Sequence, residues 1–364
     1  MKTSKSTLTV ARMALEAAKS AMDDYSHRKS PRKFTQPQLL TCLIVKEIRN
    51  LDYRGIHIML KEWSDLRHVL GLTRIPHFTT LCAASKRILR KRTSDALLQS
   101  ILQRCKDAGL LKNHSRLAAI DSTGMESRYA SRYYTHRCNR HEGHYKHYYP
   151  KLSAICDTTT HLVLGIVIDR GPRLDHAEAD ATVLSALSHQ KFATLVADAG
   201  YESERFHKWC RDVLGIRSII PTTQRGRPRH DKQSKAVTGF YRRLMQKRFP
   251  KSKYGQRWQI ETVFSMLKRN LGSAVRARRC YSQYREIRLR VLAHNLMIFR
   301  RICYVLYRAL LTPFFSRVEP GAEKRTPGFG NVNGVAAEEA LARVKSASDG
   351  DFSSAICVDG VEDI

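Results

Sequence analysis

The spacing of apolar residues changes along this chain near Arg116. Before that point apolar residues recur at every third or fourth position, which predicts helices over residues 36–49, 53–70, 79–92 and 94–108. Thr35 and Thr79 are suited to cap two of these helices, and Gly71 marks a break. Residues 1–33 are polar and basic, so we expect a basic arm ahead of the helices.

One segment of this helical part is a candidate for DNA contact. Residues 76–88 are typical of the second helix of a helix-turn-helix, a motif that places polar and basic side chains against DNA. A small helical packing unit would have the same pattern. If the segment binds DNA, the exposed side chains are expected to be those of Thr79, Ser85, Lys86 and Arg87.

After Arg116 short apolar runs replace the helical spacing. Residues 117–120 and 192–197 are buried-strand patterns, and each run ends in an aspartate, Asp121 or Asp198, followed by turn residues. Between them, residues 149–157 and 161–169 predict a hairpin. The remaining runs predict helices over 175–190 and 203–214 and a strand over 217–221.

Residues 254–271 return to helical spacing. With Tyr254 at zero and about 100° per residue, Arg257 lies near about −60°, Glu261 near about −20° and Lys268 near about −40°. A different stripe can pack against a core and consists of Ile260, Val263, Phe264, Leu267 and Leu271. A solvated face of paired charges would look the same. Glu261 could hold a metal ion only with acidic partners from elsewhere, and Asp121 and Asp198 are the candidates.

Charge narrows the class of partner. The 364 residues carry a formal net charge of +31, although residues 317–364 hold only 5 Lys+Arg against 9 Asp+Glu. Such a positive field favours a polyanion, of which nucleic acid is the usual one. A ribosomal or membrane-surface role is the alternative, but a hydrophobic fraction of 42% provides for a full core.

Other features favour a cytoplasmic protein. Nine cysteines are scattered without a C-x-x-C pair, which is typical of reduced thiols. No apolar export segment is present near the N-terminus, and the apolar run 291–311 is interrupted by arginines, His294 and Asn295, so we expect a core helix there and no membrane association.

Together these residues resemble the DDE transposases of insertion sequences. The likeness is to the branch with a Tyr-x2-Arg-x3-Glu-x6-Lys signature (insertion-sequence family 4/5 type), which here consists of Tyr254, Arg257, Glu261 and Lys268. The blocks around Asp121 and Asp198 fit as well. The resemblance covers roughly residues 115–305.

The resemblance implies an α/β fold with a ribonuclease H-like mixed-sheet catalytic core and a helical N-terminal DNA-binding domain. It implies that Asp121, Asp198 and Glu261 are catalytic and hold two Mg²⁺ ions, for which Mn²⁺ may substitute. The expected activity is binding to terminal inverted repeats, cleavage at the element ends and joining of 3′ ends to target DNA. The alternatives are a nuclease without strand transfer and an inactive, transposase-derived DNA-binding protein.

The same resemblance assigns DNA contacts and a layout. Tyr254, Arg257 and Lys268 are expected on phosphates near the cut. Trp258 could stack on a displaced base, although a tryptophan beside a helix face can equally serve packing. Independently of that resemblance, Arg225 and Arg227 stand in a short motif that resembles a minor-groove hook, and a run of arginines from Arg276 to Arg290 is expected to extend the DNA cleft. A homodimer on double-stranded DNA, associated with a prokaryotic nucleoid, is the expected assembly.

The predicted domains are a basic arm (1–33), a helical, helix-turn-helix-like domain (34–112), a catalytic domain (113–312) with a basic insertion (222–253), and a disordered tail (313–364). Two other site readings stay open. Asp157 and Asp169 flank the predicted hairpin and could replace one of the acidic ligands. A run of histidines with one cysteine could bind zinc, although its spacing matches no standard site. The run comprises His136, Cys138, His141, His144 and His147.

Overall fold

The computed structural model describes residues 6–127, 149–222 and 237–315. Residues 1–299 form one compact unit, and residues 300–364 form a second. Most of the predicted tail 313–364 lies outside the described residues, although the last helix continues to Phe315. Among the described residues, no helix is both long enough and apolar enough to cross a membrane.

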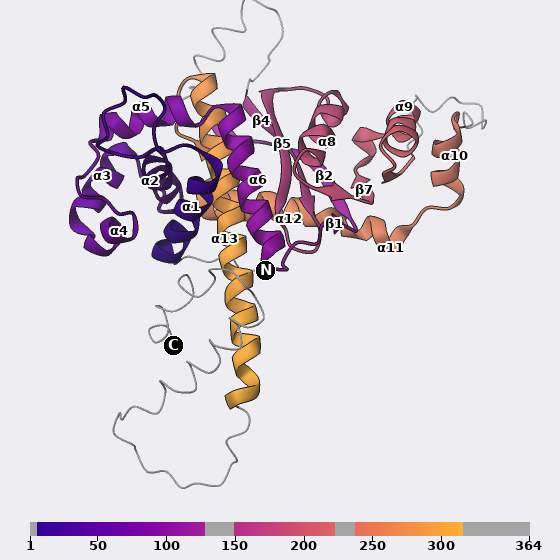
Figure 1. Cartoon of the computed structure of the whole chain (residues 1–364). Helices are drawn as coiled ribbons and strands as arrows, with labels where there is room; N and C mark the ends of the chain where they lie inside the picture. Colours follow the sequence, from indigo (N-terminus) through magenta and orange to yellow (C-terminus); the bar gives the residue numbers. More distant parts are fainter. Residues whose placement is uncertain (1–5, 128–148, 223–236, 316–364) are drawn as a thin grey trace, which may run out of the picture. The chain divides into compact units, whose positions relative to one another are not determined.

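Six helices make up the N-terminal part (Figure 1). They are α1 (Thr7–Ala21), α2 (Gln36–Ile48), α3 (Tyr53–Glu62), α4 (Ser64–Val69), α5 (Phe78–Ile88) and α6 (Lys91–Asp107). Helix α2 is central, because every residue from Leu39 to Glu47 is buried. As expected, Thr35 caps this helix, in a capping box with Gln38. Gly71 has a φ of +60°, which explains the break after α4.

Two expectations for this part differ from the structure. Where a basic arm was expected, α1 packs against α2 and α6, because Val10, Ala14 and Ala18 form an apolar stripe between its charged residues. The helix-turn-helix segment forms α5, which starts after His77 rather than at Thr79. Its Lys86 and Arg87 are exposed, but Ser85 is buried.

A five-stranded mixed sheet follows, in the order β5-β4-β2-β7-β8. Strand β2 (Ala118–Gly124) runs antiparallel to β4 (Tyr149–Asp157) and parallel to β7 (Thr194–Ala197). The outer strands are β5 (Val163–Gly171), antiparallel to β4, and β8 (Arg217–Ile219), parallel to β7. The predicted hairpin is therefore confirmed as β4 and β5. Two short pairs lie beside the sheet: β1 (His114–Ser115) with β6 (Lys191–Phe192), and β3 (Glu126–Ser127) with β9 (Ala274–Val275).

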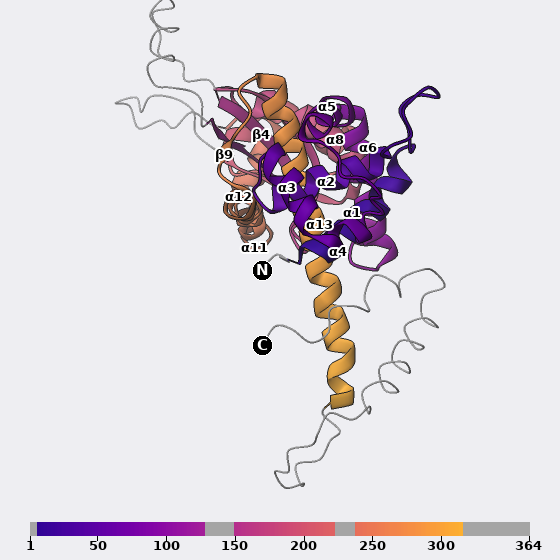
Figure 2. The same ribbon diagram turned by 90° about the vertical axis from the view of Figure 1, so that its left-hand side faces the viewer.

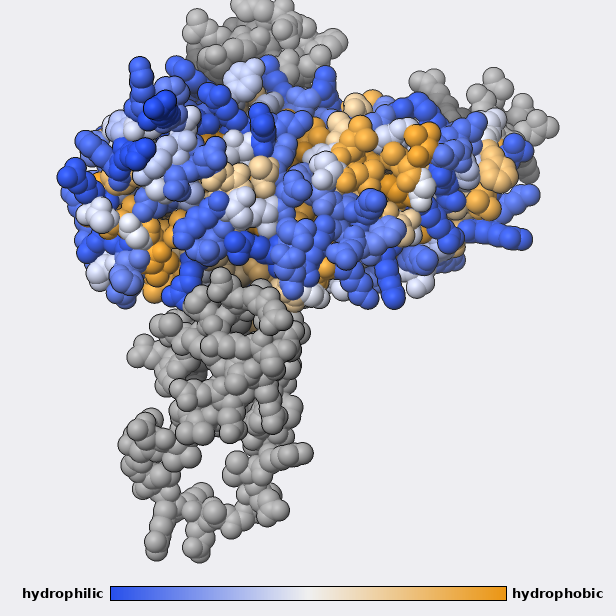
Figure 3. All heavy atoms as spheres, viewed as in Figure 1, coloured by the Kyte–Doolittle hydropathy of each residue, from blue (hydrophilic) through white to orange (hydrophobic). Residues whose placement is uncertain are grey.

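Helix α8 (Ala179–Leu187) covers one face of this sheet. It lies so close to β5 that a Cβ atom on Gly165 would stand 2.3 Å from the backbone nitrogen of Ala186. The neighbouring short helical elements are η1 (Asp175–Ala177), η2 (Ala199–Tyr201), α9 (Glu204–Lys208) and a π-helical turn η3 (Trp209–Val213). Figure 3 shows a largely hydrophilic face on which apolar atoms gather over α8, where Leu184 is exposed.

Helix α12 (Trp258–Leu271) covers the opposite face, packing on β2 and β4. The apolar stripe predicted for it is buried as expected. It does not start at Tyr254, because α11 (Lys251–Tyr254) and the 3-10 turn η4 (Gly255–Arg257) precede it. Gly255, which favours neither conformation strongly, stands at this change of helix type. Helix α10 (Phe240–Lys247) lies within the predicted insertion.

Helix α13 (Cys280–Phe315) connects the helical part to the sheet (Figures 1 and 2). The Asn295 side chain donates to the Val163 carbonyl (2.8 Å) and accepts from the Val163 amide (2.9 Å), and so pairs the outer edge of β5. On the other side, Arg290 forms an ion pair with Glu47 of α2. The two parts thus share the segment of α13 up to Phe299, and the predicted core helix is confirmed for residues 291–299, which are all buried.

Candidate active site

Sheet register brings two of the three predicted acidic residues to one edge. The parallel pairing of β2 with β7 runs from Ala118 opposite Leu195 to Ile120 opposite Ala197. Asp121 and Asp198 are the next residue on each strand, and neighbouring strands lie about 4.8 Å apart. The strand was expected to end at Asp121. In the structure β2 continues to Gly124, because β4 pairs with it that far. The two carboxylates still leave adjacent strands at the same level.

Arg257 links the third acidic residue to this edge. Its Nη2 atom lies 2.7 Å from Oε1 of Glu261, and its Nη1 atom lies 3.9 Å from Oδ2 of Asp121. The side chains are partly open to solvent, with 23% of Arg257, 21% of Asp121 and 52% of Glu261 exposed. We call Asp121, Asp198 and Glu261 the acidic group. Three residues that are far apart in sequence therefore approach one another.

The environment changes the pKa of the residues in this region. Burial raises the pKa of Asp121 to about 6, opposed by the Ser122 amide and by Arg257, while the charges of Asp175 and Asp198 add to the rise. Burial lowers the pKa of Arg257, but Glu261 and Asp198 outweigh it, so the pKa is raised overall. Arg257 therefore stays charged, and Asp198 contributes to the electrostatic field of both groups.

The other residues of the predicted stripe lie near β2 and the acidic group. Lys268 donates to the Thr123 hydroxyl at 2.7 Å, two residues beyond Asp121 on the same face of the strand. The Tyr254 ring packs edge-on against Phe249, with ring centroids 4.9 Å apart. Burial raises the pKa of Tyr254, and Asp198 and Glu261 contribute to the rise. Trp258 is 53% exposed. The predicted stripe thus lies around the acidic group.

A polar cluster missed by the sequence analysis lies behind Asp121. The Ser122 amide donates to Oδ1 of Asp121 (2.8 Å), and the Ser122 hydroxyl donates to Asp175. Lys151, almost fully buried, pairs with Asp175 (2.9 Å) and lies 3.9 Å from Glu178. Asp175 had been expected only at a helix start. The signal was Ser122 itself, since a hydroxyl next to a strand aspartate must find a partner on the opposite face.

The acidic group fits a hard divalent cation by its chemistry, because carboxylate oxygens are the ligands that Mg²⁺ prefers. In the part of the chain that the structure describes, no three His, Cys, Asp or Glu side chains are close enough to hold a metal ion. The guanidinium of Arg257 lies near carboxylate oxygens of both Asp121 and Glu261. The three carboxylates therefore fit as ligands of a metal ion once the Arg257 guanidinium has moved away from them.

Several other predicted residues lie away from this group. Asp157 accepts from the Thr160 amide and hydroxyl (both 2.8 Å), so it serves the hairpin turn rather than a metal. Asp169 pairs with Arg173. Lys86 and Arg87 stand exposed on α5, in the helical part. Arg225, Arg227 and the histidine run with Cys138 lie outside the described residues.

The expected arginine run of the DNA cleft is wrong at two positions. Arg290 is 1% exposed and donates to the carbonyls of Gly272 (2.7 Å) and Ala274 (2.9 Å), so it stabilises the end of α12. Arg276 donates to the carbonyls of Asn50 and Leu51. A count of basic residues could not show that these guanidinium groups have protein partners from distant parts of the chain.

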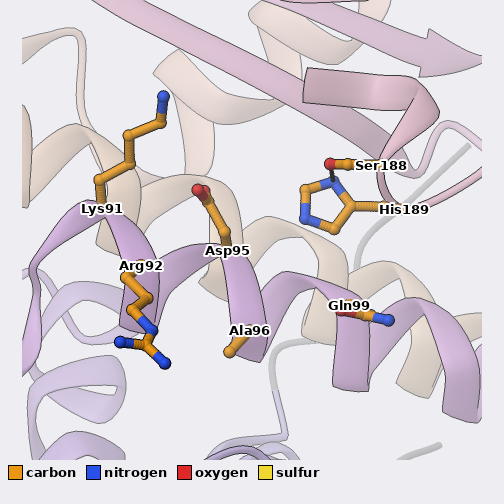
Figure 4. A pocket seen from close by; sticks show the side chains of 7 residues that line it. All are labelled: Lys91, Arg92, Asp95, Ala96, Gln99, Ser188 and His189. Carbon is orange, nitrogen blue, oxygen red and sulfur yellow. Dashed lines mark hydrogen bonds between the residues drawn. The ribbon is translucent and has the colours of Figure 1, made fainter. Parts of the chain in front are cut away.

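A shallow hollow of about 550 Å³ lies away from the acidic group. Figure 4 shows its walls, with Lys91, Asp95 and Gln99 of α6 on one side and Ser188 and His189, which follow α8, on the other. His189 is held by the Leu164 carbonyl, 3.1 Å from its Nδ1 atom. None of the predicted site residues lines this hollow, which lies between α6 and the two residues that follow α8.

The comparisons with known proteins agree with this geometry. No curated protein matches the chain. A family model described as "Transposase DDE domain" matches residues 112–296, which is slightly more than half of the chain and includes the whole acidic group. Members of this family are enzymes that cut and join DNA, and the mixed sheet is consistent with their ribonuclease H-like core. The chain therefore belongs to the transposase DDE domain family.

Proposed function

We propose that this protein binds the terminal inverted repeats of its own element, cleaves at the element ends and joins the 3′ ends to target DNA. The observation that carries the proposal is the approach of three distant carboxylates. Asp121 and Asp198 leave adjacent strands at one level, and Arg257 joins Asp121 to Glu261. The Tyr254, Arg257, Glu261 and Lys268 spacing supports the insertion-sequence 4/5 type.

Each carboxylate has a role as ligand. Asp121, Asp198 and Glu261 would hold two Mg²⁺ ions, or Mn²⁺, which when bound polarise the phosphodiester and ready the attacking oxygen. The Ser122 amide fixes one oxygen of Asp121, so its other oxygen, Oδ2, faces Arg257. Glu261 stands in the first turn of α12, where the helix dipole favours its negative charge.

The surrounding side chains suit DNA. Arg257 offers a planar fork to a phosphate beside the cut, Lys268 offers a point charge, and Tyr254 offers a hydroxyl. Trp258 is exposed enough to stack on a base displaced from the duplex end. Lys86 and Arg87 on α5, together with Arg225 and Arg227, would add contacts farther along the duplex. Because both ends must be held for joining, we propose a homodimer on DNA.

The test is divalent-metal-dependent cleavage of duplexes taken from both flanks of the gene. Asp121→Asn should lower the cleavage rate by about 10²- to 10³-fold, the loss typical of removing one preorganised electrostatic group. Asp169→Asn is the matched control, because it removes a strand carboxylate that pairs with Arg173 outside the acidic group. Unchanged Mg²⁺-dependent cleavage by Asp121→Asn would remove Asp121 from the mechanism.

A second assay separates the proposal from its alternatives. A duplex with a pre-cut 3′ end should be joined to target DNA by the wild-type protein. Cleavage without joining would identify a nuclease. Binding to the flanks with neither reaction would identify an inactive DNA-binding protein.

A further inference from the structure

We infer that Arg257 guards the acidic group in the absence of DNA, so that divalent cations load fully only after a DNA phosphate has drawn its guanidinium away. Arg257 is then a specificity-determining residue, because it makes cation loading depend on a correctly placed DNA end. The inference rests on the proposed function and deepens it. It assigns to Arg257 a role in the DNA-free protein as well as the expected one on the phosphate.

The first support is geometric. The two terminal nitrogens of one guanidinium face carboxylates from two different elements, Glu261 on α12 and Asp121 on β2. A positive charge thus stands between two of the three side chains expected to hold cations. In residues 6–127, 149–222 and 237–303, moreover, no three potential ligands lie close enough for a metal. The guanidinium and the cations therefore compete for the same oxygens.

The second support is that Arg257 can leave. Its ion pair with Glu261 is an i,i+4 pair whose carboxylate is half exposed, and such pairs contribute little to stability. The contact with Asp121 is long, at 3.9 Å. Arg257 also ends the 3-10 turn η4 and is itself 23% exposed, so solvent and a phosphate can reach it. A phosphate offers the fork the same planar arrangement of oxygens as a carboxylate.

The two binding events are then linked. When a phosphate takes the guanidinium, Asp121 and Glu261 lose their counter-charge and attract divalent cations more strongly. Thermodynamic linkage requires the reverse as well, so bound cations favour the DNA-bound position of Arg257. Nonspecific DNA that does not place a phosphate beside η4 leaves the Arg257 guanidinium near Asp121 and Glu261.

The experiment measures Mn²⁺ affinity of the full-length protein without DNA, from the spin-resonance signal of free Mn²⁺. Arg257→Ala should bind Mn²⁺ about fivefold to tenfold more tightly than wild type, in line with the loss of two partly exposed ion pairs. Arg257→Lys keeps a charge without the fork and should lie between the two. Arg269→Ala is the matched control, because it removes one exposed positive charge from the same helix and should leave the affinity unchanged.

A second titration adds a pre-cut duplex from the gene's flank. After subtraction of the Mn²⁺ bound by DNA alone, wild-type affinity for Mn²⁺ should rise about fivefold to tenfold more than that of Arg257→Ala, because only wild type has a guanidinium to displace. Equal affinity of wild type and Arg257→Ala without DNA would overturn the guard and leave the proposed function standing. Absence of Mn²⁺ binding in every variant, with and without DNA, would instead defeat the proposed function.

Discussion

Two arginines of this protein each lie between two carboxylates, and their surroundings differ. Arg290 is 1% exposed; it pairs with Glu286 (2.6 Å), lies 3.6 Å from Glu47 and donates to two backbone carbonyls. Arg257 is 23% exposed, and its two ion pairs join it to carboxylates that stay partly open to solvent. The first arrangement is closed on all sides, whereas the second can exchange its partners.

The difference separates an arginine with a structural role from one that has the exposure its proposed role on DNA requires. Glu47, Glu286 and Arg290 hold α2, α13 and the end of α12 together, so they fix the helix that carries Glu261. Arg257 and the acidic group lie at the other end of that helix, where incomplete burial leaves room for ligands. In a strongly basic protein, the burial of a guanidinium and the number of its protein partners therefore indicate function better than its position in a basic run.

The largest expected effect concerns Arg290. Arg290→Met should destabilise the protein by about 3–5 kcal/mol, because it leaves Glu47 and Glu286 buried with one counter-charge fewer. Arg257→Met should change stability by no more than about 1 kcal/mol, since its partners remain hydrated. Urea unfolding measures both. Similar losses for the two variants would break the distinction between the closed and the open arginine.

The partly buried Asp121 carboxylate is expected to lower the stability of the folded protein at neutral pH. Burial raises the pKa of Asp121 from 3.8 to about 6. Between these values the folded state binds more protons than the unfolded state, so stability falls as pH rises through this window and then levels off. Asp121→Asn should therefore stabilise the metal-free protein at pH 7, by about 2 kcal/mol.

This gain should be much smaller at pH 4, where Asp121 is protonated in the folded state and only partly ionised in the unfolded state, and it should vanish below both pKa values. Thermal unfolding of wild type and Asp121→Asn at pH 4 and pH 7 gives the comparison, with Asp169→Asn as the control. A constant difference between the two pH values would show that the Asp121 carboxylate is not the cause. In the same window, metal-dependent cleavage by the wild-type protein should rise with pH, because ligands must be ionised.

Much of the site could be predicted because its signals are local. Asp121 and Asp198 each end an apolar run, and parallel strands of similar pattern carry such residues to one edge. The spacing of Arg257 and Glu261 follows from helical geometry alone. The hairpin of β4 and β5 was also visible, since two apolar runs flank a turn at Thr158–Thr160.

The remainder depends on partners distant in sequence. No local pattern shows that Arg290 meets Glu47, or that the Ser122 hydroxyl meets Asp175. The basic composition of residues 1–33 did not indicate the apolar stripe of α1. Net charge is a property of the whole segment, whereas packing depends on one face of the helix. The position of Arg257 between two acidic residues likewise required the strand and the helix together.

A smaller effect is expected for DNA cleavage by Arg257→Ala. End cleavage should fall about tenfold, a loss of ~1.4 kcal/mol, because the phosphate beside the cut loses its fork. Nonspecific DNA binding should change less than about twofold, since one arginine adds little to a strongly basic surface. Filter binding and cleavage on the same flank duplex provide the two values. Equal losses in both would place Arg257 in the general basic field, like an exposed surface arginine.

The smallest effect is expected for Trp258, the exposed aromatic next to Arg257. Trp258→Ala should leave stability nearly unchanged and lower end cleavage about fivefold, at the low end of base stacking, which is worth about 1–3 kcal/mol per base. Tyr281→Ala is the matched control, because Tyr281 is 78% exposed and lies at the start of α13. If Trp258 holds a displaced base, duplexes whose last pair is mismatched should reduce the difference between variant and wild type. A loss for Trp258→Ala that Tyr281→Ala reproduces, or that follows a drop in melting temperature, would mean that Trp258 serves packing, and the open end of α12 would then contribute charge alone.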